Sequence, residues 1–234
     1  MKDGDFVGTR GTYGFRHNGR EYLFYNRFDS YFTGLGINVI NVIKSIDVET
    51  MRRAVDNHVR VKSDDKATDE EYKELLAAGI PMLDDREAQM YADDPESWYV
   101  LLREIQYEVK YFASGLVRFW PLSNDFINDT LFCEWGYIID LDAERLEIYR
   151  NGRHLAGMMT FYFIKEHDFN DDGELWESYY EAWPKFNEET LESFVDYCKS
   201  RRYLDKRNYD LSNLVYQKDS VKDVYQAIEI LKAS

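Results

Sequence analysis

The sequence predicts a single α+β domain over residues 1–234, with antiparallel hairpins forming a sheet that helices cover. Three observations support this prediction. Apolar and polar residues alternate at the front and centre of the chain, whereas elsewhere apolar residues recur at helical spacing. No internal repeat and no proline- or glycine-rich linker divides the chain. Hydrophobic residues make up 44% of the chain and charged residues 31%, a balance typical of a folding globular protein.

The N-terminal hairpin is predicted over residues 11–26. Residues 12–16 and 21–25 alternate in polarity around Asn18-Gly19. An Asn-Gly pair tolerates the positive φ angles that a two-residue hairpin turn requires. The glycine-rich loop 26–36 then leads into the helical part of the chain.

Helices are predicted within residues 37–109. An apolar helix over 37–46 is followed by a second helix that Asp47 caps, and Thr68 with Glu71 forms a capping box for a third. Asp94-Pro95 is expected to open a further helix, whose apolar residues share one face. These residues are Trp98, Leu101, Leu102 and Ile105.

A central hairpin is predicted over residues 131–149, because the run LFCEWGYIIDL is apolar and rich in strand-forming residues. Its turn is placed at Asp142–Glu144. We expect six of its side chains to be buried: Leu131, Ile138, Ile139, Leu141, Leu146 and Ile148. A further strand is expected at 160–164, and C-terminal helices at 187–232.

The acidic charge is concentrated in two segments. The net charge is −15 with a pI of about 4.7, which argues against direct nucleic-acid binding. Residues 64–96 carry 12 acidic and 3 basic groups, and residues 166–192 carry 10 and 1. Such an acidic surface can be a solvated face, or it can bind the basic site of another protein in place of phosphates. Within the second segment, Asp171, Asp172 and Glu174 are the candidate binding residues.

The sequence predicts no metal site, no cofactor and no assigned catalytic residue. The stretch from Asp168 to Gly173 begins like a calcium loop, but the twelfth position is Tyr179 where an EF-hand needs Glu. Cys133 and Cys198 cannot form a disulfide framework, which favours a reducing cytoplasm. No apolar run approaches the ~20 residues that a membrane span requires. The oligomeric state is left open.

The most distinctive motif is the N-terminal stretch GTRGTYGF, in which three glycines surround Arg10 and Tyr13. Glycines within a strand indicate a bend or a close approach of another chain segment. One hypothesis is a binding site in which Arg10 holds an anionic group and the following loop supplies Asp29 and Ser30. The alternative is structural: Arg10 pairs with Asp29, and the glycines make room for neighbouring strands.

The chain resembles an uncharacterised family of phage and bacterial proteins in several short segments. These are GTRGTYGF, the following FDSY and GLG, and the later CEWGYIIDLD and LEIY. The resemblance covers Gly8–Gly36 and Cys133–Tyr149. It implies a phage or mobile-element setting, and no reaction.

Two functions follow as hypotheses. The first is an acidic cytoplasmic protein that binds and inhibits a basic host or defence protein, since exposed aromatic residues among carboxylates suit an interface. The alternative is an N-terminal-nucleophile-like hydrolase that acts on an amide or small molecule. Its base would be the free α-amino group of Thr9, after cleavage at Gly8–Thr9. Binding is preferred because no nucleophile–base pair is visible in the sequence.

Overall fold

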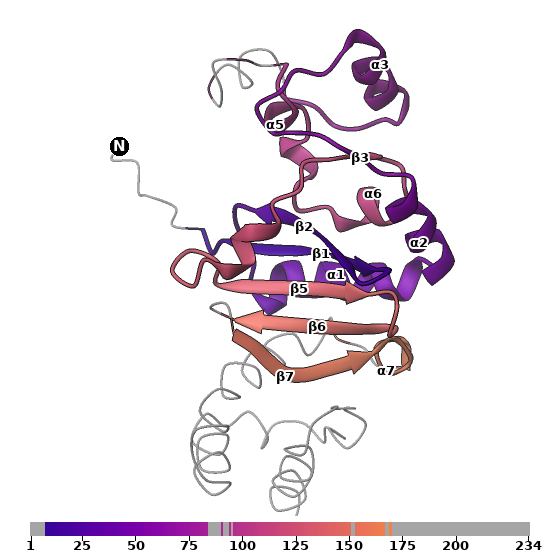
Figure 1. The fold of residues 1–234 in the computed structure, drawn as a ribbon, viewed down its shortest axis with the longest axis vertical. Coiled ribbons are helices and arrows are strands. Elements are labelled where there is room, and N and C mark those ends of the chain that lie inside the picture. The colour runs from indigo at the N-terminus through magenta and orange to yellow at the C-terminus, as the bar shows by residue number, and fades with distance from the viewer. Residues whose placement is uncertain are drawn as a thin grey trace, which may run out of the picture.

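The computed structural model describes residues 8–83, 90, 94, 96–150, 153–166 and 169, and its architecture is α+β, as predicted. A five-stranded sheet in the order β2-β1-β5-β6-β7 runs through the middle of the molecule (Figure 1). Its strands are β1 (Gly11–His17), β2 (Arg20–Asn26), β5 (Trp135–Asp140), β6 (Arg145–Arg150) and β7 (Arg153–Thr160). A second, two-stranded sheet pairs β3 (Val59–Arg60) with β4 (Phe119–Trp120).

The two hairpins contribute to one sheet, and the sheet is mixed, because the pairing between the hairpins is parallel. β1 and β2 pair antiparallel around Asn18-Gly19, whose φ angles are 52° and 68°. β5 and β6 also pair antiparallel, with Glu144 at a φ of 50° in their turn. Between these two hairpins, however, β1 and β5 run parallel. A parallel pair needs a long crossover connection. Here residues 18–134, which include β2, connect β1 to β5.

The helical elements differ from the prediction mainly in length. They are η1 (Phe32–Gly36), α1 (Ile37–Ser45), α2 (Val48–Asp56), α3 (Asp69–Ala77), α5 (Trp98–Leu101), η2 (Arg103–Ile105), α6 (Val109–Ala113), η3 (Asn124–Asn128) and α7 (Phe161–Glu166). The Asp47 side chain accepts from the Thr50 N–H at 2.9 Å, and Thr68 with Glu71 forms the predicted capping box. The helix expected around Trp98 is short, and one turn of 3₁₀-helix follows it.

Two predicted strand segments are wrong. The central hairpin begins at Trp135, because the Asp129 carboxylate accepts the N–H groups of Leu131 and Phe132 and holds them in a turn. Leu131 is consequently 77% exposed. The segment expected as a strand at 160–164 is instead α7, in which Phe161 and Ile164 are buried while Tyr162 is exposed. Phe161 and Ile164 are three positions apart, so both lie on the buried face of a helix. The burial of this face outweighs the strand propensity of the aromatic residues.

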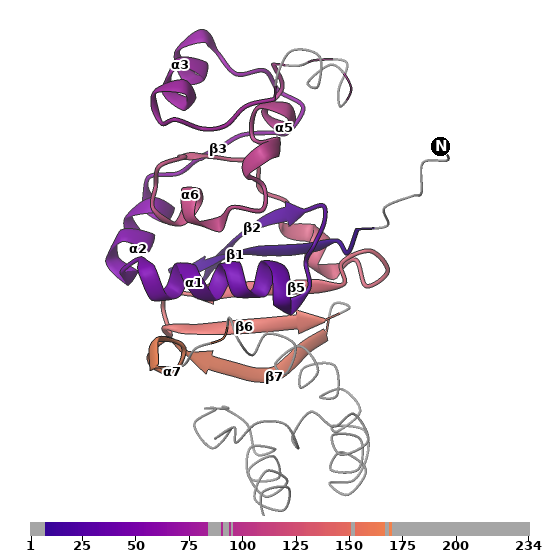
Figure 2. The same ribbon diagram turned by 180° about the vertical axis from the view of Figure 1, so that it is seen from behind.

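Helix α1 covers one face of the sheet (Figure 2). The core there combines strand residues with apolar residues of α1, and all are at most 3% exposed: Tyr13, Phe15, Tyr137, Ile139, Leu146, Ile148, Val39, Ile40 and Ile43. On the opposite face, Leu23, Ile127 and Ile138 form a smaller cluster. Ile138 and Leu141 are buried as predicted. The helices predicted at 187–232 lie outside the described residues.

Candidate functional site

The glycines at the start of β1 allow other segments to approach closely. A Cβ added at Gly14 would lie 2.1 Å from the backbone oxygen of Tyr22. A Cβ added at Gly11 would lie 2.5 Å from the backbone oxygen of Trp135 and 2.6 Å from the Ser30 Cβ. Neither position has room for a side chain. Close approach of strand and loop therefore explains these two glycines without a ligand.

Ser30 is fully buried beside Gly11, and its polar groups bond within the fold. Its N–H donates to the Thr9 carbonyl at 3.2 Å, and its hydroxyl accepts from the Asn26 Nδ2 at 2.7 Å. Its carbonyl accepts from the Tyr137 hydroxyl at 3.0 Å. In this structure Ser30 fastens the loop after β2 to β1 and β5.

Asp29 lies on the same loop and is exposed, with a left-handed φ of 50°. Its carbonyl accepts from the Leu35 N–H at 3.0 Å. Burial, aided by the charges of Asp29 and Glu108 and a hydrogen bond to Asp29, raises the pKa of Tyr107 to about 12. Asp29 therefore lies beside Tyr107.

Arg10 lies at the surface, with its guanidinium 5.4 Å from the centre of the Phe132 ring. In the part of the chain that the structure describes, no ion pair joins Arg10 to Asp29. The pairing that the structural alternative required is thus absent. The candidate residues surround the start of β1, but each has a different environment.

Tyr13 lies two positions after Gly11 on β1, and therefore on the same face of the sheet. Its ring is fully buried and stacks on Phe24 at 5.1 Å between ring centres. Burial, with a smaller contribution from Glu108, holds the pKa of its hydroxyl well above the usual value. The hydroxyl has no hydrogen-bond partner among the described residues. The residue lies beside a cavity whose other walls include Tyr99 and Gln106.

Sequence reasoning missed the cavity walls that come from residues 99–106. The predicted helix places Trp98, Leu101, Leu102 and Ile105 on one apolar face, and Tyr99 and Gln106 are not among them. One signal in the sequence is the pair Tyr99 and Arg103. These residues are one helical turn apart, and neither belongs to the apolar face. In the structure, the Arg103 guanidinium stacks on the Tyr99 ring and donates to its hydroxyl.

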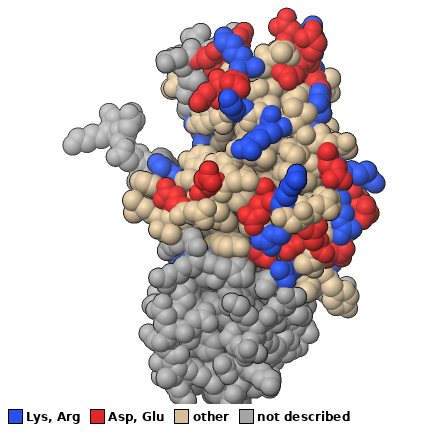
Figure 3. All heavy atoms as spheres, in the orientation of Figure 1, with Lys and Arg blue, Asp and Glu red and all other residues tan. Residues whose placement is uncertain are grey.

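A different kind of surface surrounds α3, where Asp and Glu side chains gather at the top of the molecule (Figure 3). Leu75 is the buried residue of this helix, while Tyr72 is 41% exposed and Leu76 is 52% exposed. Tyr72 and Leu76 are one helical turn apart and therefore adjacent on the surface.

The carboxylates near this exposed pair differ in how far they are neutralised. Glu74 binds Arg118 through two hydrogen bonds of 2.6 and 2.8 Å, and this contact lowers the pKa of Glu74. Asp69 and Glu70, by contrast, have no ion pair with any Lys or Arg that the structure describes. The same is true of Asp64 and Asp65 in the preceding loop. The second acidic segment, with Asp171, Asp172 and Glu174, lies outside the described residues.

Comparisons with family models, with curated proteins and with solved structures find no match to this chain. The resemblance to phage and bacterial proteins therefore stays a prediction. Within the described ranges, no group of three His, Cys, Asp or Glu residues could hold a metal ion. No helix in those ranges is long and apolar enough to cross a membrane.

The hydrolase alternative depends on Thr9, which is buried just before β1. Its carbonyl accepts from the Ser30 N–H, so its backbone is held by the loop after β2. The mechanism further requires that Thr9 carry a free α-amino group. An intact-mass measurement of the purified protein tests that requirement, because a chain that retains Met1 lacks the base.

Proposed function

We propose that the protein binds a basic host or defence protein through the surface of α3 and inhibits it by occupying its nucleic-acid-binding site. The observation that carries this proposal is the exposed pair Tyr72 and Leu76 beside carboxylates that no described cation neutralises. Such an arrangement supplies two contributions to binding. The apolar pair offers buried area, and the charge offers long-range attraction.

The local charge supports a basic partner. Residues 64–83 contain six acidic and two basic groups, and one of the two, Lys66, already pairs with Asp94 and Glu96. Lysine and arginine groups that normally contact phosphates can contact spaced carboxylates instead. Attraction of this kind accelerates association and is screened beyond about 10 Å at 0.1 M salt.

The helix is built to present this surface rigidly. The capping box at Thr68 fixes its first turn, and Gly79 ends it with a φ of 69°. The bidentate contact between Glu74 and Arg118 attaches its inner side to the segment next to β4. A preformed helix loses little conformational entropy when it binds.

The test is a pull-down from bacterial cytoplasm with the full chain, at low and high salt, followed by identification and purification of the retained protein. Association rates are then measured for the wild type, for D69N/E70Q and for Y72A. We expect D69N/E70Q to slow association several-fold at low salt and to weaken its salt dependence. Y72A should mainly speed dissociation, because Tyr72 contributes contact area.

A matched control neutralises two exposed carboxylates away from α3, in the variant E104Q/D125N. It should bind as the wild type does. The proposal fails if no protein is retained, or if D69N/E70Q and E104Q/D125N bind alike. Inhibition is checked separately, by adding nucleic acid and asking whether it competes with this protein for the partner.

A further inference from the structure

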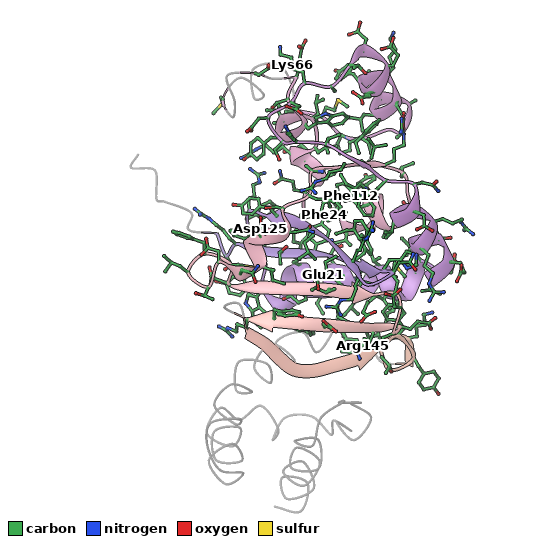
Figure 4. All side chains as sticks on the ribbon, viewed as in Figure 1. Glu21, Phe24, Lys66, Phe112, Asp125 and Arg145 are labelled. Carbon is green, nitrogen blue, oxygen red and sulfur yellow. The ribbon has the colours of Figure 1, made fainter. Side chains whose placement is uncertain are left out.

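The turns of the two hairpins lie at the same end of the sheet, and one carboxylate joins them. Asp142 belongs to the turn between β5 and β6, just before Arg145, which is labelled at that end of the sheet in Figure 4. Its Oδ1 accepts the backbone N–H of Asn18, and its Oδ2 accepts that of Gly19, each at 3.0 Å. The hydrogen bonds from Gly19 and Asn18 lower the pKa of Asp142. The carboxylate is therefore ionised at neutral pH and ties the first turn to the second.

The first turn contains a reactive pair of residues. When glycine follows asparagine, the glycine nitrogen is unhindered because glycine has no Cβ. Asn18 is exposed, and its side-chain amide has no hydrogen bond to any residue that the structure describes. Asn18 and Gly19 both have left-handed backbone conformations, with φ angles of 52° and 68°. The Asn18 side chain is thus free to react, whereas the Gly19 nitrogen is held by Asp142.

Deamidation is the reaction that such a pair undergoes. The Gly19 nitrogen gives up its proton and forms a bond to the Asn18 Cγ, while the Cγ–Nδ2 bond breaks and ammonia leaves with that proton. The product is a succinimide ring. A water molecule then opens the ring at either carbonyl and leaves aspartate or isoaspartate at position 18. Nothing is oxidised or reduced, and water is the only co-reactant.

The contact with Asp142 opposes the first step of this reaction in two ways. The hydrogen bond to a charged acceptor holds the proton on the Gly19 nitrogen, and the nearby negative charge disfavours its loss. The same contact holds the backbone of the turn in one conformation, so the nitrogen does not turn toward the Asn18 side chain. The Gly19 nitrogen therefore reacts after the first turn has separated from Asp142.

We propose that Asn18 is a latent deamidation site and that Asp142 protects it by binding the Gly19 N–H. Deamidated chains then accumulate in proportion to the time that the contact between the hairpins spends open. The product carries a carboxylate beside Asp142, and repulsion between the two charges weakens the contact. Isoaspartate also lengthens the backbone of a two-residue turn. This proposal does not depend on the α3 surface.

The test follows deamidation at position 18 of the full chain in H₂¹⁸O, by mass spectrometry of the peptide that contains this position. The folded wild type should react about tenfold or more slowly than the wild type in guanidinium chloride, because hydrogen bonds to a charged group keep the turn closed. D142A should react about tenfold faster than the folded wild type, because it lacks those hydrogen bonds. In guanidinium chloride the two chains should react at the same rate.

A matched control removes the other carboxylate near the first turn. The His17 ring lies between Asp142, 3.2 Å from its Nδ1, and Asp56, 3.5 Å from its Nε2. The Gly19 N–H is bound by Asp142 and not by Asp56, so D56A should deamidate at the wild-type rate. A second measurement needs no variant. Hydrogen exchange at the Gly19 N–H of the wild type should be slower than in an unstructured peptide of the same sequence.

The proposal is overturned if the folded wild type deamidates as fast as the unfolded chain, or if D142A reacts no faster than D56A. Exchange of the Gly19 N–H at the rate of the unstructured peptide overturns it as well. Circular dichroism establishes that each variant is folded before the rates are compared. If D142A does not fold, the hydrogen-exchange result decides.

Discussion

The two faces of the central sheet bury polar groups in different ways. On the face away from α1, Arg16 of β1 binds Asp140 of β5 at 2.9 Å and Glu147 of β6 at 2.7 Å. Arg145 also contacts both of these carboxylates. On the face toward α1, the Tyr13 hydroxyl has no hydrogen-bond partner among the described residues, whereas the Tyr137 hydroxyl donates to the Ser30 carbonyl. The first face therefore pairs its buried carboxylates within the fold, whereas the second buries the Tyr13 hydroxyl without a hydrogen bond in an aromatic core.

This difference explains why the charged face is assigned to stability, although it is the more conspicuous cluster. Asp140 and Glu147 are each nearly inaccessible, but each has two arginine partners. The Asp140 carboxylate also accepts the backbone N–H groups of Asp142 and Ala143. A buried charge whose bonding capacity is filled within the fold is poorly placed to act on another molecule.

The largest predicted effect comes from breaking the charged cluster. R16M should lower the free energy of unfolding by about 3–5 kcal/mol, because it leaves the buried carboxylates of Asp140 and Glu147 with too little compensating charge. Urea denaturation at pH 7 measures the loss. The control R53M removes an exposed arginine on α2 and should change stability by no more than about 0.5 kcal/mol. Equal losses in the two variants would contradict the assignment of this face to stability.

The next effect concerns the apolar packing of the face that α1 covers. Ile139 lies there, fully buried between β1 and β6. I139A should cost about 2–5 kcal/mol through lost burial and the cavity left behind. L131A provides the contrast, because Leu131 is 77% exposed, and its loss should be below about 0.5 kcal/mol. Urea denaturation of both variants tests whether the strand begins where the structure places it.

These two leucine and isoleucine positions illustrate what sequence could predict. Ile139 lies in a run whose apolar character extends over neighbouring residues, and its burial follows from that local pattern. Leu131 belongs to the same apolar run, but its backbone N–H donates to the Asp129 carboxylate in a turn. A hydropathy pattern does not predict that hydrogen bond. The capping box of Thr68 with Glu71 and the turn at Asn18-Gly19 were predicted correctly from the sequence. Each involves a few adjacent residues and one dominant interaction.

The candidate sites were harder to predict because they are assembled from distant parts of the chain. Tyr13 was singled out from its own strand, but the cavity beside it has Gln106 in its wall, more than ninety positions away. The parallel pairing of β1 with β5 brings together the charged cluster in the same way. Periodicity reports which face of an element is apolar, and it does not report which elements meet.

Alkaline pH should affect the charged face through Tyr149. Its hydroxyl donates to the Glu147 carboxylate at 2.9 Å. Burial, with the charge of Glu147, raises its pKa to about 12. Because the folded pKa lies above the unfolded value near 10, the stability contribution is present below pH 10 and is lost as the pH rises through 12. Wild type should therefore lose more stability than Y149F between pH 9.5 and 11.5, as measured by urea denaturation.

The smallest predicted effect compares two buried hydroxyl groups that lie side by side in the sheet. Tyr13 and Tyr137 are register partners, and both rings are fully buried. The Tyr137 hydroxyl donates to the Ser30 carbonyl at 3.0 Å, whereas the Tyr13 hydroxyl has no protein partner in the described chain. Y137F removes a hydrogen bond and leaves a buried carbonyl with one partner fewer, so it should cost about 1–2 kcal/mol. Y13F removes only an unpaired group, so stability should change by less than about 0.5 kcal/mol or rise. Urea denaturation of the two variants decides the point, and equal losses would mean that the Tyr13 hydroxyl is already satisfied within the protein.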